Sequence, residues 1–238
     1  MCYFDEIQGK YVHVARIDKL SDDAKIPKET KKIYDKYRKS FFFTEKYDFY
    51  KGKEKTDFLF HIDKLKIKKG GLYVIKGENG KRKKYVFELL FGNVKLSFSR
   101  GGFILTDEMD EAAFLTYPIF TVDGDFMKNM YEIPIDKELM HLLQVDFSDK
   151  EILSNPVNLS LRTAAKNFAL LRVFGLNSPI LFLDEPLSNL DKKTQENVVA
   201  YIRKLKGEKT ILVVMHSDEL DEAADSVIYI ENKKLIQK

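Results

Sequence analysis

Two runs of consecutive apolar residues are the clearest structural signal in the chain. They span residues 180–183 (ILFL) and 211–214 (ILVV), and each follows a stretch of helical sequence, at 161–175 and 191–206 respectively. Continuous apolar strands that alternate with helices are typical of a parallel sheet covered on both faces. This part of the chain therefore predicts an α/β fold.

The first half of the chain alternates more between apolar and polar residues, as strands with one buried face do. The predicted elements are strands at 10–19, 41–50, 58–65 and 72–75, the last after a Gly70-Gly71 turn, and helices at 28–39 and 83–91; a closing strand is predicted at 226–230.

Composition narrows the class of protein. With 238 residues, 44% of them hydrophobic, the chain can bury one sizeable core, with or without a small attached lobe. Its net charge of +3 is small beside 40 basic and 37 acidic residues, which argues against a nucleic acid as the main ligand. The single cysteine, Cys2, suits a reducing compartment, and no stretch approaches the roughly 18 apolar residues that span a bilayer. We expect a cytoplasmic protein.

Candidate chemistry lies at the ends of the two apolar strands. Asp184 and Glu185 follow the first strand, and His216 follows the second. Ligand sites of open α/β sheets lie at the carboxyl ends of the strands. There an aspartate can hold Mg²⁺, a glutamate can polarise the water that attacks a γ-phosphate, and a histidine can reach that phosphate. A strand that merely ends in acidic residues is the alternative, and the histidine 25 residues after Asp191 favours the functional reading.

These residues resemble motifs of the ATP-binding-cassette (ABC) ATPases. Asp184-Glu185-Pro186 resembles the Walker B motif, Ser188-Asn189-Leu190-Asp191 the D-loop, and His216 the H-loop. The resemblance covers residues 41–238 and implies a P-loop ATPase-like, mostly parallel sheet flanked by helices. It also implies an antiparallel β lobe and a helical subdomain at about 108–175. Residues 1–40 lie outside it and are expected to form an N-terminal extension.

The resemblance also implies a role for each site residue. Glu185 and His216 would be catalytic, and Asp184 would hold Mg²⁺. Residues 77–85 stand where the family has its P-loop, and residues 158–163 where it has its signature motif. Tyr50, or Phe49 beside it, stands where an aromatic ring stacks on adenine. The residues implied to bind ATP are Tyr50, Gly77, Asn79, Gly80, Lys81, Arg82, Lys83, Lys84, Tyr85, Ser160 and Asp191.

The P-loop departs from the pattern G-x-x-x-x-G-K-[ST] at two positions that matter for phosphate binding. Gly77 and Lys83 are in place, but Arg82 replaces the second glycine and Lys84 the hydroxyl residue. Arg82 adds a side chain where the backbone curls around phosphate oxygens, and Lys84 brings a cation where Mg²⁺ needs a lone pair. The four cations at 81–84 stand at the predicted start of a helix, where they oppose the helix dipole. Either an anionic partner or a solvated basic surface would explain them.

Two further motifs are altered. In place of Leu-Ser-Gly-Gly-Gln the chain has Leu159, Ser160, Leu161, Arg162 and Thr163. The Q-loop glutamine should fall near residues 116–118, yet no glutamine occurs between positions 8 and 144. We therefore expect ATP to bind weakly or not at all, and Mg²⁺ to lack its hydroxyl and glutamine ligands.

Three functions follow from this reading. The first is a degenerate nucleotide-binding subunit of an ABC transporter, docked on a membrane permease at the inner face of the membrane and paired with a second such subunit. The second is an active ABC ATPase that energises transport at a modest rate. The third is a soluble pseudo-ATPase that binds another protein through its basic loop and residues 1–40.

Overall fold

The computed structural model describes residues 40–51, 57–77, 86, 96–98, 104–105, 112–116, 119, 130, 133–134, 136–145 and 162–238. The chain forms two compact units: Met1–Asp110 together with Ala224–Lys238, and Glu111–Ala223. Within the described residues, no helix combines the length and the apolar content that crossing a bilayer requires.

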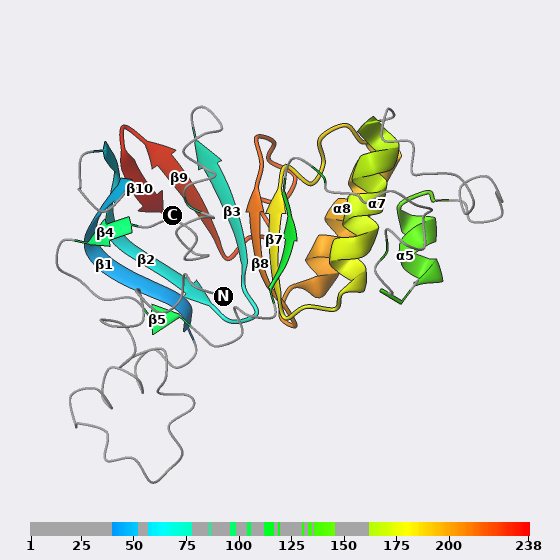
Figure 1. The fold of residues 1–238 in the computed structure, drawn as a ribbon, viewed down its shortest axis with the longest axis horizontal. Helices are drawn as coiled ribbons and strands as arrows, with labels where there is room; N and C mark the ends of the chain where they lie inside the picture. The colour runs from blue at the N-terminus through cyan, green and yellow to red at the C-terminus, as the bar shows by residue number, and fades with distance from the viewer. Residues whose placement is uncertain are drawn as a thin grey trace, which may run out of the picture. The chain divides into compact units, whose positions relative to one another are not determined.

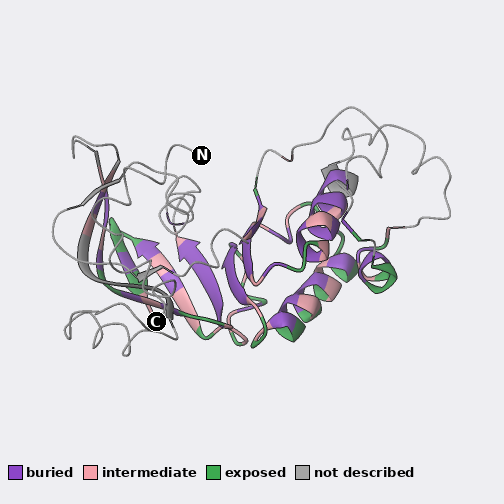
Figure 2. Cartoon of the chain, turned by 60° about the horizontal axis from the view of Figure 1, so that its bottom comes forward, coloured by how far each residue is buried: buried purple, intermediate pink, exposed green. Residues whose placement is uncertain are grey.

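The first unit contains a lobe built on two long antiparallel strands, β1 (Ser40–Lys51) and β2 (Asp57–Lys68). Two short strands, β4 (Leu96–Phe98) and β5 (Ile104–Leu105), pair with β1 and are also antiparallel to it. Phe49 and Phe60 are partners across β1 and β2, with ring centroids 5.3 Å apart, and neither ring is exposed. On β2, Phe60, Ile62, Leu65 and Ile67 are buried, whereas Asp63, Lys64 and Lys68 are exposed (Figure 2).

Three further strands complete the sheet of the first unit (Figure 1). They are β3 (Leu72–Gly77), β9 (Ser226–Glu231) and β10 (Lys234–Gln237). β3 runs parallel to β9, β9 and β10 form a hairpin, and β10 runs parallel to β2. Residues 72–76 of β3 are all buried.

One outward-facing pair on the lobe is polar. Asp48 of β1 lies opposite His61 of β2, and the His61 Nδ1 atom is 2.6 Å from Asp48 Oδ1. The other ring nitrogen, Nε2, lies 3.1 Å from Asp63 Oδ1. The bond to Asp48 is the largest influence on the histidine, and the two carboxylates together raise the pKa of His61.

The second unit is built on three parallel strands in the order β8 (Thr210–Val214), β7 (Ile180–Asp184) and β6 (Ala113–Leu115). All five residues of β8 are buried, as are residues 180–183 of β7. Phe114 and Phe182 stack between β6 and β7 with centroids 4.9 Å apart. The continuous apolar runs therefore form strands buried on both faces, as predicted.

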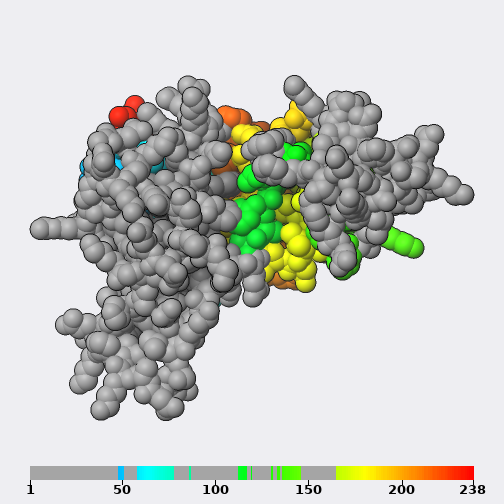
Figure 3. Space-filling model, viewed as in Figure 1, coloured from blue at the N-terminus to red at the C-terminus, as the bar shows by residue number. Residues whose placement is uncertain are grey.

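Helices α7 (Arg162–Gly175) and α8 (Lys192–Leu205) lie beside these strands (Figure 1). Phe174 of α7 meets Tyr201 of α8 edge-on, at a centroid distance of 4.9 Å. A short third helix, α5 (Lys137–Leu142), begins at the N-cap Asp136, whose side chain accepts bonds from the Glu138 and Leu139 N–H groups. In Figure 3, the coloured atoms of this unit are green for the described residues between 112 and 145 and yellow for those of α7 and β7, and the two groups lie next to each other on the face shown.

The predicted fold class, a P-loop ATPase-like α/β fold with an antiparallel lobe and helices, is confirmed by the structure and its neighbours described below. The predicted strands at 41–50, 58–65, 72–75, 180–183, 211–214 and 226–230 and helices at 161–175 and 191–206 each match an observed element. Strands β4, β5, β6 and β10 and helix α5 had no counterpart among the predicted elements. The predicted strand at 10–19 and helix at 28–39 lie outside the described residues, as does the helix at 83–91 apart from Val86, which is helical and buried. The division at residue 40 stays a prediction.

Candidate functional site

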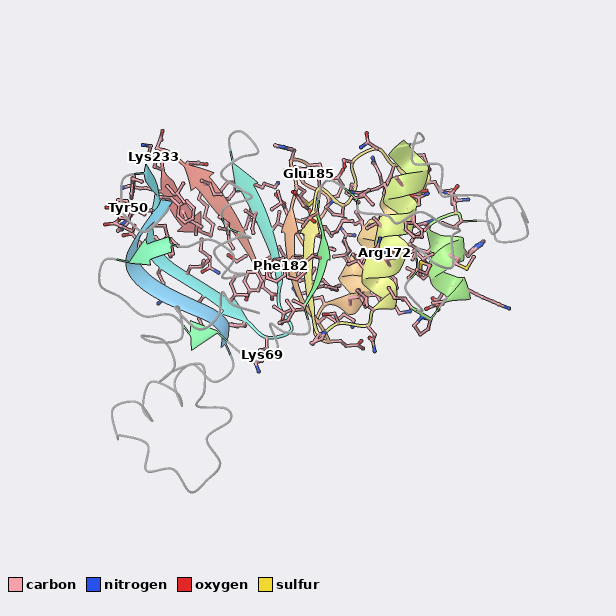
Figure 4. The ribbon with its side chains drawn as sticks, in the orientation of Figure 1. Tyr50, Lys69, Arg172, Phe182, Glu185 and Lys233 are labelled. Atoms are coloured by element: carbon pink, nitrogen blue, oxygen red, sulfur yellow. The ribbon has the colours of Figure 1, made fainter. Side chains whose placement is uncertain are left out.

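The carboxyl ends of β7 and β8 meet at one edge of the second unit. The register pairs Asp184 with Val214, so the residues that follow each strand emerge side by side. Glu185 Oε1 lies 3.2 Å from His216 Nε2. The His216 side chain is 66% exposed and that of Glu185 29%, so the histidine is open to a ligand while the glutamate is partly covered. We call Asp184, Glu185 and His216 the acidic edge; Figure 4 labels Glu185 at the end of β7.

The backbone of Glu185 adopts the left-handed conformation, with φ at 48°. This region is uncommon for a residue with a side chain. The Glu185 N–H donates to the Val214 carbonyl at 2.8 Å. Its own carbonyl accepts from the Ser188 hydroxyl at 2.9 Å and from the Ser188 N–H at 3.1 Å. Hydrogen bonds on both sides of the residue therefore hold the turn that carries the glutamate.

A third donor to the same carbonyl comes from α7. Lys166 has no exposed surface, and its Nζ atom lies 2.6 Å from the Glu185 carbonyl oxygen. Burial lowers the pKa of Lys166 to about 8, while the charges of Asp184 and Glu185 oppose that change. The ammonium is therefore mostly charged at neutral pH and lies against the acidic edge.

The sequence analysis missed Lys166, although a signal for it was present. On a helix, residues three, four and seven positions apart share a face. Ala169, Leu170 and Val173 stand at these spacings from Lys166, and all three are buried. A lysine in line with three apolar residues of a core-facing helix is a candidate for a buried cation, because such residues are almost never fully buried without a partner.

Asp191, predicted to bind nucleotide, is the N-cap of α8. Its Oδ2 atom accepts from the Thr194 hydroxyl at 2.6 Å and its Oδ1 atom from the Thr194 N–H at 3.0 Å. These bonds, the hydroxyl first, lower the pKa of Asp191. The Gln195 side chain donates to the carbonyls of Leu187 and Leu190 at 3.1 Å each. The segment between β7 and α8 is thus fixed at its helical end.

Two predicted nucleotide contacts lie in the first unit. Tyr50 of β1 packs edge-on against Phe58, with centroids 5.4 Å apart, and Lys233 Nζ lies 5.7 Å from the Phe58 centroid (Figure 4). Gly77 is the last residue of β3, beside Ile230 of β9. A Cβ atom on Gly77 would lie 2.7 Å from the Ile230 carbonyl oxygen, so the close approach of two backbones excludes a side chain there.

The remaining predicted contacts cannot be placed. Asn79, Gly80, Lys81, Arg82, Lys83, Lys84, Tyr85 and Ser160 lie outside the described residues. Among the residues that the structure does describe, no group of three or more metal-binding side chains occurs. Mg²⁺ is usually held by one or two carboxylates together with water and substrate phosphates. The carboxylate of Asp184, with that of Glu185 beside it, fits such a water-rich site.

No protein-family model matches the chain. Among curated proteins, the chain is 26% identical over 196 residues to a probable ABC transporter ATP-binding/permease protein of Haemophilus influenzae. It is 32% identical over 111 residues to an ATP-dependent lipid A-core flippase of Pasteurella multocida, and 28% identical over 106 residues to the energy-coupling factor transporter ATP-binding protein EcfA2 of Staphylococcus epidermidis. These matches cover 72%, 47% and 43% of this chain, but only 35%, 18% and 37% of the three relatives.

Solved structures share the fold. A bacterial Atm1-family ABC exporter with ATP bound aligns with 82% of this chain and 38% of its own, at a TM-score of 0.68 and 16% identity. A dimeric post-hydrolysis state of the ATP-binding cassette MJ0796, bound to ADP and Pi, aligns with 83% of this chain and 97% of its own, at a TM-score of 0.63 and 18% identity. The chain therefore has the fold of an ABC ATPase domain.

Proposed function

We propose that this chain, whose curated relatives are ABC transporter ATP-binding proteins and whose fold is that of their ATPase domains, is a nucleotide-binding subunit of an ABC transporter with weak or absent ATP hydrolysis. In this proposal it docks on a membrane permease at the inner face of the membrane. It pairs there with a second nucleotide-binding subunit, either a copy of itself or a different chain. It contributes shape and regulation more than turnover.

One observation carries the proposal: Glu185 and His216 of the acidic edge are in contact, but the predicted P-loop has lost two of the residues that bind phosphate and Mg²⁺. Glu185 and His216 lie 3.2 Å apart at the edge of the sheet. In the sequence, by contrast, Arg82 and Lys84 replace the tight-turn glycine and the hydroxyl residue. Hydrolysis depends on charge stabilisation by a held Mg²⁺ and by the phosphate grip, so losing these contacts should suppress turnover even where the carboxylates persist.

Each residue of the acidic edge has a distinct role in this proposal. Asp184 would hold Mg²⁺, which when bound would neutralise charge on the transferred phosphoryl group. Glu185 would orient the attacking water through its carboxylate. His216, the more exposed of the contacting pair, would donate a hydrogen bond toward a phosphate oxygen.

The test is an ATPase assay of the purified chain with Mg²⁺, in the natural sequence and in a variant with Arg82→Gly and Lys84→Thr. We expect turnover near background in the natural chain. The repaired variant should gain activity on the order of a hundredfold, since a correctly held metal is worth several kcal/mol. Adding Glu185→Gln to the repaired variant should abolish that gain.

A matched control removes two cations elsewhere. Lys192 and Lys193 are adjacent and exposed at the start of α8, so Lys192→Gly with Lys193→Thr changes the net charge equally without touching the P-loop. This control should stay at background. Robust turnover of the natural chain that Glu185→Gln abolishes would contradict the proposal and favour an active ATPase of modest rate. The intact contact between Glu185 and His216 is the observation that keeps this second candidate open.

The partner is tested by purification from a native membrane extract. Recovery of a transmembrane protein with the chain supports docking on a permease. Recovery of a soluble protein alone opposes it, and favours a pseudo-ATPase that serves as an interaction module.

A further inference from the structure

The side chain of a buried lysine contacts Glu185, the residue to which the proposed function assigns water activation. Lys166 lies within α7, is wholly buried, and donates from Nζ to the Glu185 carbonyl oxygen at 2.6 Å. The contact joins residues 19 positions apart, on a helix and on the turn after β7. It is therefore a tertiary contact and does not arise from local helix or turn geometry.

Packing alone does not account for a lysine at this position. Burying an ammonium group costs several kcal/mol after relaxation, and an apolar residue of the same volume is usually neutral or stabilising in its place. The neighbours of Lys166 on the same helical face, such as Ala169, Leu170 and Val173, are apolar. A methionine would fill the space beside them, so what the lysine adds is a charged donor at the Glu185 carbonyl.

The recipient residue has an unfavourable backbone conformation. Glu185 has a left-handed φ of 48°, which costs roughly 1–2 kcal/mol for a residue with a side chain. Pro186 follows it and disfavours the right-handed helical alternative. Uncommon conformations of this kind persist where surrounding contacts over-determine them, and they cluster at functional sites.

The Glu185 side chain also meets a specific neighbour. Its Oε1 atom lies 3.2 Å from His216 Nε2, while its N–H is bonded to Val214 of the adjacent strand. A backbone rotation at Glu185 would change the direction of the carboxylate, because φ and ψ set the direction of the Cα–Cβ bond relative to the neighbouring peptide groups. The contact with His216 thus depends on the conformation that Lys166 supports.

We propose that Lys166 is a positioning residue: by donating to the Glu185 carbonyl, it holds Glu185 in the left-handed conformation that directs its carboxylate to His216. The inference rests on the proposed function in assigning Glu185 to the chemistry. The contact and its consequence need no nucleotide, so they can be tested whether or not the chain hydrolyses ATP.

The experiment measures amide hydrogen exchange and histidine ring resonances by NMR in the full chain without nucleotide. In Lys166→Met, the amides of Glu185 and Ser188 should exchange about tenfold faster, as expected for the loss of a bond to a charged donor. The His216 ring resonances should move toward those of Glu185→Ala, in which the carboxylate is absent. Lys166→Arg, which retains a charged donor, should restore both readouts.

Lys209→Met is the matched control. Lys209 is also a partly buried lysine of the second unit, and it donates to the Asn177 side chain and the Ser178 carbonyl, away from Glu185. It should leave Glu185 and His216 unchanged. If Lys166→Met is folded and likewise leaves both readouts unchanged, the proposal is overturned and the lysine has only a structural role.

A second variant keeps the test decisive if Lys166→Met does not fold. Ser188→Ala removes the hydroxyl that also donates to the Glu185 carbonyl. If Lys166 holds the carbonyl, the His216 resonances should stay in place in this variant. If they shift to the Glu185→Ala positions, Ser188 positions the glutamate and the assignment to Lys166 is wrong. None of these readouts uses turnover, so failure here leaves the proposed function standing.

Discussion

Replacing Lys166 by methionine should stabilise the protein at neutral pH. The substitution preserves the length of the side chain and removes a charge that has no exposed surface. It leaves the Glu185 carbonyl with two donors, the hydroxyl and the N–H of Ser188. This expectation is opposite to that for most substitutions of fully buried residues, which destabilise.

The magnitude follows from the proton equilibrium. Burial lowers the pKa of Lys166 from 10.5 to about 8. Each pKa unit corresponds to about 1.4 kcal/mol, so the charged form costs the fold about 3 kcal/mol. Methionine also forgoes one hydrogen bond from a charged donor, worth about 2 kcal/mol. Lys166→Met should therefore gain about 1 kcal/mol in the free energy of unfolding at pH 7.

The pH dependence gives the sharper test. Below pH 8 the folded and unfolded chains both hold the proton on Lys166, and the cost is fully present. Between pH 8 and 10.5 the unfolded chain binds more protons, so the stability of the natural chain rises with pH. By pH 9.5 about 2 kcal/mol of the cost should be gone, and the advantage of methionine should shrink by that amount.

Urea unfolding followed by far-UV circular dichroism, at pH 7 and at pH 9.5, measures both quantities. Lys193→Met is the control, because this lysine is exposed on α8 and its replacement removes no buried charge. A difference between the natural chain and Lys166→Met that is the same at both pH values would refute the reasoning. So would a loss of more than about 2 kcal/mol in Lys166→Met at pH 7.

Three further outcomes are expected. Gly77→Ala should lower the free energy of unfolding by about 1–3 kcal/mol, because the new Cβ would lie 2.7 Å from the Ile230 carbonyl; calorimetry measures the loss, and an unchanged melting temperature would contradict it. Asp191→Ala should lower the free energy of unfolding by about 1 kcal/mol, because α8 loses its N-cap. Asp191→Asn, measured in the same denaturation series, should retain most of this stability, because asparagine is also a good N-cap. His61→Gln should destabilise the lobe more at pH 6 than at pH 8.5. The raised pKa of His61 beside Asp48 gives a stabilisation that is present below pH 6.5 and is lost as pH rises through the folded-state pKa, so equal losses at both values would argue against it.

The parts of the fold that could be predicted from the sequence are those with a strong pattern of apolar residues. The ILFL and ILVV runs predicted β7 and β8, because an uninterrupted apolar run of this length is typical of a strand buried on both faces of a parallel sheet. β6 (Ala113–Leu115) has three residues, too few to show a period, and it forms because β7 offers an edge for it. β10 (Lys234–Gln237) has only two apolar residues, yet it pairs with both β2 and β9. These two strands form through pairing with other strands, and the local sequence pattern does not predict them.

The same division holds for the candidate site. The spacing of Asp184, Glu185 and His216 along two successive strands placed them at one edge in the sequence analysis, and the structure brings Glu185 and His216 within 3.2 Å. The left-handed backbone of Glu185 had no sequence signal, since glycine or asparagine is the usual mark of that conformation. Lys166 had a signal in its helical phase, which the sequence analysis did not use. Whether these residues act on ATP stays a prediction.

The close approach of two strands at Gly77 matters for re-engineering this protein. Strand β3 is pressed against the Ile230 backbone at its last residue, so the chain leaves the sheet at one defined place. Whatever sequence follows that glycine begins from the same origin. The P-loop residues of an active ABC ATPase could therefore be grafted at positions 78–85 while the sheet is left unchanged.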